Sequence, residues 1–186
     1  MSVVEPVDAL RAAPGDPHSD RERFRGRRLA AVLFTDIVGS ASHAWRLGDQ
    51  AWCELLEEHD ALVRGELDAH RGREIDTSDD GFFATFDGAS AAVCCALAIR
   101  DVLADVGLEV RSGVHVGEFE ERGARLGGIA VAVGARVAAA AEAGEVLVSR
   151  TVRDLVLGSG LRFRERGPHS LKGVPGSWLL YSVEEA

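Results

Sequence analysis

Two aspartates stand where carboxylates can bind divalent cations. Asp36 directly follows the apolar run at residues 29–34, and Asp80 lies between two β-prone stretches, in the segment 78–81. Mg²⁺ takes few protein oxygens and completes its shell with phosphate and water, so two carboxylates at one end of a sheet suit a pair of such ions. The alternative is that Asp36 caps a turn or helix and that Asp80 belongs only to an Asp-Gly turn. Position alone leaves both interpretations open.

Other catalytic patterns are absent from the sequence. There is no G-x-x-x-x-G-K-[ST] loop and no G-x-G-x-x-G turn, which excludes the P-loop and Rossmann classes. Ser40 and Ser42 lack the surroundings of a hydrolase nucleophile elbow. No H-x-x-x-H spacing occurs among the six histidines, and His59 and His115 are expected to be packed or surface groups rather than ligands.

Length and composition indicate a single globular domain. The chain has 186 residues, of which 46% are hydrophobic and 27% charged. The net charge of −9 argues against nucleic acid as a partner. No apolar run of membrane-spanning length and no signal-peptide pattern occurs, so we expect a cytoplasmic protein without a membrane partner. The cysteines, without C-x-x-C spacing, are expected to be buried small hydrophobic residues: Cys53, Cys94 and Cys95.

The elements that position these residues can be predicted from periodicity. Residues 1–28, rich in proline and charge, are expected to be a flexible tail or linker. The run at 29–34 has no polar alternation, as in a strand buried on both faces. A helix capped by Asp49 and ending near Gly72 follows. The Asp-Gly pair within 78–81 then predicts a hairpin of strands 74–77 and 82–86.

The second half continues the alternation. Hydrophobic patterning predicts helices at 89–104, 129–141 and 151–156, strands at 108–116 and 145–148, and short strands around Phe163, Leu171 and residues 179–181. This order predicts an α+β fold with a ferredoxin-like split βαβ core (βαββαβ) and extra C-terminal α/β elements, in one domain at 29–186. We expect an antiparallel sheet with its helices packed on one face.

Several of these motifs together resemble a known family. They occur in the order seen in class III nucleotidyl cyclase domains, in particular the actinobacterial adenylate cyclases, and the resemblance covers residues 29–183. The motifs are LFTDIVGS at 33–40, DGF at 80–82, VRSGVHVG at 110–117, the helix at 128–137 and LKGV at 171–174.

The resemblance implies an activity and a metal site. Members of this family convert a nucleoside triphosphate to a 3′,5′-cyclic nucleotide and pyrophosphate, at sites shared across a head-to-tail homodimer. By motif, Asp36 and Asp80 would be the metal carboxylates and the Ile37 carbonyl a further ligand, for two Mg²⁺ or Mn²⁺ ions.

The resemblance also assigns three cations. Arg111 matches the family's phosphate-binding arginine on the same chain. Arg136, contributed by the partner chain, matches the catalytic arginine that stabilises charge developing on the α-phosphate. Lys172 matches the lysine that binds the terminal phosphates.

Four positions depart from the family pattern. Asp76 replaces the adenine-reading lysine, and Arg125 replaces its aspartate partner, so the two charges are exchanged. This pair is expected either to form a mutual salt bridge or to bind a purine edge in the reversed sense, which would favour guanine. Ala132 replaces the ribose-orienting asparagine, and Asp79 replaces a glycine before the metal aspartate.

Two functional hypotheses follow. The first is a slow cyclase acting on ATP, with GTP as the other candidate substrate. The alternative is a catalytically degenerate cyclase homology domain that binds a nucleotide or dimerises as a regulatory module.

Overall fold

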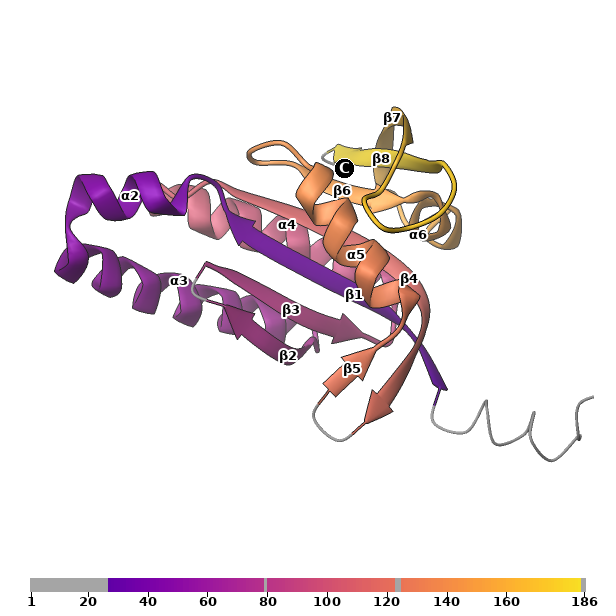
Figure 1. The fold of residues 1–186 in the computed structure, drawn as a ribbon, viewed down its shortest axis with the longest axis horizontal. Coiled ribbons are helices and arrows are strands. Elements are labelled where there is room, and N and C mark those ends of the chain that lie inside the picture. The colour runs from indigo at the N-terminus through magenta and orange to yellow at the C-terminus, as the bar shows by residue number, and fades with distance from the viewer. Residues whose placement is uncertain (1–26, 79, 123–124, 185–186) are drawn as a thin grey trace, which may run out of the picture.

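The computed structural model describes residues 27–78, 80–122 and 125–184. Its centre is one mixed sheet with the strand order β2-β3-β1-β4-β6-β8-β7, with β5 paired to β4 (Figure 1). The strands are β1 (Arg27–Ile37), β2 (Arg73–Ser78), β3 (Gly81–Phe86), β4 (Val110–Arg122), β5 (Arg125–Gly127), β6 (Val146–Ser149), β7 (Arg162–His169) and β8 (Trp178–Glu184). The helices are α2 (Ser40–Leu47), α3 (Asp49–Ala69), α4 (Ala89–Asp105), α5 (Ile129–Ala140) and α6 (Arg150–Leu155).

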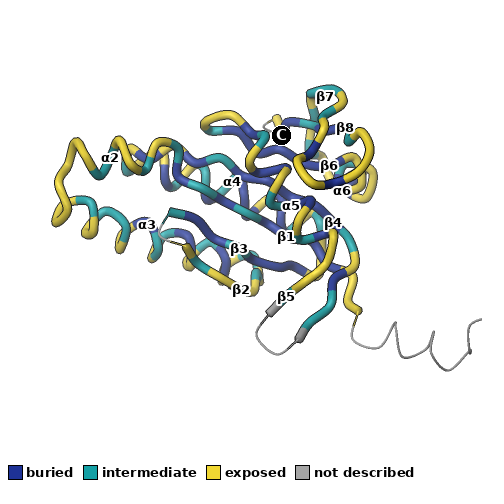
Figure 2. The backbone as a smooth tube through the Cα atoms, viewed as in Figure 1, coloured by how far each residue is buried: buried dark blue, intermediate teal, exposed yellow. Residues whose placement is uncertain are grey.

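Strands β2, β3, β1 and β4 form the predicted split βαβ core. β1 lies between β3 and β4 and is antiparallel to both, and β2 and β3 form the expected hairpin. The α+β class, the βαββαβ order and the additional C-terminal elements are therefore confirmed. Figure 2 shows β1, β3 and β4 buried along most of their length, whereas α2 contains no buried residue.

Helices cover both faces of the sheet, so the expectation of helices on one face is wrong. Leu33 of β1 belongs to the same core cluster as Val93 and Ile99 of α4. On the opposite face, α5 crosses in front of β1 and β4 (Figure 1), and a Cβ at Gly134 would lie 2.6 Å from Val32. An uninterrupted apolar strand such as β1 requires cover on both sides. The sheet is also not purely antiparallel, since β4 and β6 run parallel.

Several local expectations need correction. Leu171 lies outside any strand, because its buried side chain instead packs into a core cluster below α5 with Leu147 and Leu180. Helix α2 was not predicted. The N-cap of α3 is Gly48, and Asp49 is its first residue.

Burial and boundaries also differ from expectation in part. Cys53 and Cys94 are exposed, and only Cys95 of the three is buried as expected. β1 begins at Arg27, whereas residues 1–26 of the expected tail lie outside the described residues. Within the described part of the chain, no helix has both the length and the apolar character needed to cross a membrane.

Candidate active site

The structure brings Asp36 and Asp80 together. Asp36 near the end of β1 is the register partner of Gly81, the first residue of β3, and Asp80 directly precedes that glycine. The Ile37 amide donates to the Asp80 carbonyl at 2.8 Å. Because β1 and β3 are antiparallel neighbours, the end of β1 lies beside the beginning of β3, which brings the two aspartates together. Asp79 lies outside the described residues.

Each carboxylate is held through one of its two oxygens. Arg111, the register partner of Asp36 on β4, donates from Nε to Oδ2 of Asp36 at 2.7 Å and also from Nη2 to the same oxygen. The Ser40 hydroxyl donates to Oδ2 of Asp80 at 2.8 Å. Among the described residues, no hydrogen bond reaches Oδ1 of either aspartate, so both carboxylates retain an oxygen for another ligand.

This donor set fits Mg²⁺ or Mn²⁺. Within the described ranges, no group of three or more His, Cys, Asp or Glu side chains is arranged to hold a metal ion. Two carboxylates with a nearby backbone carbonyl, that of Ile37, suit hard cations that keep most of their shell for water and phosphate. The residues present therefore fit the ions that the sequence resemblance implies.

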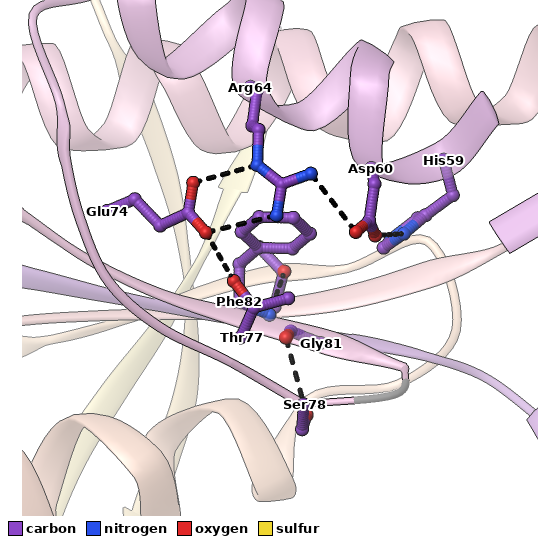
Figure 3. Close-up of polar contacts among 9 residues, drawn as sticks. His59, Asp60, Arg64, Glu74, Thr77, Ser78, Gly81 and Phe82 are labelled. Atoms are coloured by element: carbon purple, nitrogen blue, oxygen red, sulfur yellow. Dashed lines mark hydrogen bonds and ion pairs between the residues drawn. The ribbon is translucent and has the colours of Figure 1, made fainter. Parts of the chain in front are cut away.

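The hairpin that carries Asp80 is anchored to α3 by a polar cluster (Figure 3). Arg64 of α3 donates from Nε and Nη2 to the two carboxylate oxygens of Glu74, at 2.9 and 3.1 Å, and from Nη1 to Asp60. Its guanidinium also lies over the Phe82 ring, 5.2 Å from the centroid. Hydrogen bonds from Arg64 and Thr77 lower the pKa of Glu74, which keeps this carboxylate ionised. The cluster fixes β2 and β3 against α3.

Arg136 and Lys172 form a second, separate group. Arg136 projects from α5, and its Nε donates to the backbone carbonyl of Lys172 at 3.1 Å. Both residues are exposed, and neither side chain pairs with a carboxylate among the described residues. No hydrogen bond or ion pair in this part of the chain joins them to Asp36, Asp80 or Arg111. One chain therefore presents the predicted metal and phosphate residues as two groups.

Asp76 lies at a hollow on the open face of β1, β3 and β2. The rings of Phe34 and Phe83 stack there with centroids 4.4 Å apart, and both residues line the hollow together with Asp76. The Asp76 carboxylate accepts a hydrogen bond from the Thr77 amide at 3.1 Å. Ala132 is exposed on α5. The side chain of Arg125 lies outside the described residues, so its predicted pairing with Asp76 remains a prediction.

A larger cavity of about 690 Å³ lies beside α5, and none of the predicted site residues line it. His115 and Trp178 lie on its wall, with ring centroids 5.7 Å apart. His115 Nδ1 lies 2.7 Å from the Ser149 hydroxyl, and burial lowers the pKa of this imidazole to about 4. The sequence left open whether His115 and His59 are packed or surface groups, and both are buried.

Sequence reasoning missed two residues, one that contacts Asp80 and one that contacts the hairpin carrying it: Ser40 and Arg64. Ser40 was considered only as a nucleophile, although its position four residues after Asp36 was the available signal. Arg64 gave no signal, because its partner Glu74 lies on another element and their pairing depends on how α3 packs.

Comparisons with known proteins identify the family. Residues 26–185 match the Adenylate and Guanylate cyclase catalytic domain family. A Rhizobium meliloti (strain 1021) protein with the provisional name adenylate cyclase 3 is 30% identical over 157 residues, which are 80% of this chain and 27% of that protein. An uncharacterised Mycobacterium tuberculosis (strain H37Rv) protein is 29% identical over 168 residues, 87% of this chain and 58% of the relative. The chain thus spans about a quarter of the length of the first relative and somewhat over half of the length of the second.

Solved structures share the fold. The adenylyl cyclase CyaB from P. aeruginosa superposes with a TM-score of 0.79 and 22% identity, covering 86% of this chain and 95% of that one. The guanylate cyclase domain of RhGC from Catenaria anguillulae, solved in complex with GTP, gives a TM-score of 0.75 with 18% identity. The match covers 84% of this chain and 96% of that one. The nucleotide cyclase fold expected from the sequence is confirmed.

Proposed function

Because the chain belongs to the adenylate and guanylate cyclase catalytic domain family, we propose that it converts a nucleoside triphosphate to a 3′,5′-cyclic nucleotide and pyrophosphate. One observation carries this proposal. The chain presents an acidic group for metal ions, Asp36 and Asp80, and a separate pair of exposed cations that have no carboxylate partner among the described residues, Arg136 and Lys172. In a protein with a net charge of −9, unpaired cations of this kind are suited to phosphate.

In this proposal, Asp36, Asp80 and the Ile37 carbonyl hold two Mg²⁺ or Mn²⁺ ions. When bound, such ions acidify the ribose 3′-hydroxyl and neutralise triphosphate charge. The 3′-hydroxyl loses its proton to solvent as its oxygen attacks the α-phosphorus in line. A bond to that phosphorus forms, and the bond from that phosphorus to the α–β bridging oxygen breaks, which releases pyrophosphate. Arg111 turns from Asp36 toward the phosphates of the same site.

Arg136 and Lys172 act on a site in a second copy of the chain. Arg136 is the catalytic arginine that stabilises charge at the α-phosphate, and Lys172 binds the terminal phosphates. A head-to-tail homodimer supplies both groups to each site, because an isolated chain keeps them apart. We place the protein in the cytoplasm, with no nucleic acid or membrane as partner.

Base selection and rate are set by the departures from the family pattern. Asp76 accepts hydrogen bonds, as its contact with the Thr77 amide shows, and guanine offers donors at N1 and N2. Ala132 cannot donate the hydrogen bond that orients the ribose in the family pattern. Losing one hydrogen-bond donor to a transition state typically lowers the rate by roughly 10²–10³-fold. We therefore propose a slow cyclase that takes ATP, and GTP through Asp76.

The second candidate function is a regulatory module that binds nucleotide or dimerises without turnover. Asp76 and Ala132 favour it, because both replace residues that contact substrate in the family pattern. Restoring the pattern with Asp76→Lys, Arg125→Asp and Ala132→Asn distinguishes the two. A sharp rise in cyclic AMP formation supports the cyclase, whereas an unchanged rate supports the module.

The direct test is product formation by the full chain. We expect cyclic nucleotide from ATP or GTP with Mn²⁺ or Mg²⁺, measured by chromatography, and its disappearance in Asp36→Ala. Absence of product from both nucleotides contradicts the cyclase proposal. Tight binding of the metal–nucleotide complex in calorimetry without product then points to the regulatory module.

A further inference from the structure

Ser40 contacts the carboxylate of Asp80 directly. Its hydroxyl donates to Oδ2 at 2.8 Å in a half-buried setting, across 40 positions of sequence. Ser40 is the first residue of α2, and Asp80 lies in the turn between β2 and β3. The contact therefore links the segment that follows one metal carboxylate, Asp36, to the side chain of the other.

The backbone gives both ends of this contact a defined position. The Ile37 amide donates to the Asp80 carbonyl, and the Val38 amide donates to the Glu109 carbonyl, each at 2.8 Å. Gly39 then turns the chain into α2 with a left-handed conformation, φ 69° and ψ 32°. On the other side, a Cβ at Gly81 would lie 2.3 Å from the Thr35 carbonyl oxygen, so this turn lies tightly against β1. Ser40 thus reaches Asp80 from a well-anchored segment.

We propose that Ser40 is a positioning residue for Asp80. The hydroxyl selects one orientation of the carboxylate, occupies Oδ2 and leaves Oδ1 for a divalent cation shared with Asp36. An aspartate ordered before the cation arrives loses less side-chain freedom on binding. Groups that orient metal ligands in this way are worth about 10–100-fold in metal affinity. The inference rests on the proposed function and deepens it, because it adds a residue to the same metal site.

A purely structural role for the hydroxyl is disfavoured by its contacts. The start of α2 has no side-chain cap hydrogen bond, and its first turn is held by backbone bonds from Ser42 and His43 to the Gly39 carbonyl. Removing the Ser40 hydroxyl therefore leaves these bonds in place. Ser42 lies on the same turn, is exposed, and makes no side-chain hydrogen bond to a described residue, which makes it the matched control.

The test measures Mn²⁺ binding to the nucleotide-free full chain by calorimetry. We expect Ser40→Ala to weaken the affinity about tenfold. Ser40→Thr, which keeps the hydroxyl, should restore most of it, and Ser42→Ala should match the wild type. In an Asp80→Ala background, Ser40→Ala should have no further effect, because the group it positions is gone.

Ser40→Cys provides a second variant of similar size with a weak donor, and thermal unfolding of each variant verifies folding. Equal Mn²⁺ affinity in the wild type, Ser40→Ala and Ser40→Cys overturns the inference, as does a wild type that binds no Mn²⁺. Neither result depends on product formation. If Mn²⁺ affinity depends on Ser40 but no cyclic nucleotide forms, the inference stands and the cyclase proposal fails.

Discussion

Arg111 and Asp36, register partners on β4 and β1, form an ion pair in which Nε and Nη2 of the arginine both donate to Oδ2 of the aspartate. Before ligands bind, the positive charge of Arg111 therefore offsets the negative charge of a candidate metal carboxylate. A residue assigned to phosphate is thus held by the group assigned to the metal, which couples the two binding events. Both side chains are about one-third exposed, at 38% for Arg111 and 32% for Asp36, so solvent weakens the pair.

The first prediction concerns this pair. In Arg111→Ala, Asp36 no longer shares Oδ2, so Mn²⁺ affinity of the nucleotide-free protein should rise by about threefold, as expected for removal of a partly exposed ion pair. Affinity for the triphosphate should fall at least tenfold, because a charge-assisted phosphate contact is lost. Calorimetry with each ligand separates the two effects. Changes of the same sign for both ligands contradict the assignment.

A second prediction tests whether the two groups of site residues meet across chains. Asp36→Ala and Arg136→Ala should each be inactive alone, because every site in either homodimer lacks one group. When the two are mixed and allowed to exchange, heterodimers have one intact site. With random pairing, cyclic nucleotide formation should recover to about a quarter of the wild-type rate. Continued inactivity after demonstrated subunit exchange argues against a shared site.

The third prediction follows from His115. Burial lowers its pKa to about 4, below the value of an unfolded histidine, so the unfolded chain binds more protons between these pH values. The free energy of unfolding should therefore fall as the pH drops from 6.5 toward 4. His115→Gln should remove about 2 kcal/mol of the loss between pH 7 and 4.5. Urea unfolding at both pH values measures the free energy of unfolding. If that free energy falls by the same amount between about pH 7 and pH 4.5 in the wild type and in His115→Gln, the assignment is ruled out.

The fourth prediction concerns the close approach of α5 to the sheet. A Cβ at Gly113 of β4 would lie 2.1 Å from the backbone nitrogen of Ala138, and neither backbone can move without disrupting the sheet or helix. Gly113→Ala should cost about 3 kcal/mol of folding free energy or prevent folding. Gly65→Ala is the control, because nothing lies within 4 Å of a Cβ there and alanine favours the helix by about 0.5–1 kcal/mol. Thermal unfolding compares the two variants.

The amino-acid sequence alone determined the core of the fold and the family. The apolar run before Asp36 and the Asp-Gly turn at Asp80 are local patterns, and they predicted the strand and hairpin that the structure contains. The order of elements then predicted the split βαβ core, in which Asp36 lies near the end of one strand and Asp80 directly precedes the neighbouring strand. Local hydrophobic periodicity and turn chemistry are sufficient for such features.

Only the tertiary structure decided which face each helix covers and which side chains meet. Periodicity shows that a helix has an apolar side but not where that side packs, so the position of α5 opposite α4 could not be predicted. The contacts of Ser40 with Asp80 and of Arg64 with Glu74 join residues on different elements. The separation of Arg136 and Lys172 from Asp36 likewise depends on chain packing. These relationships arise from long-range packing, which no local pattern encodes.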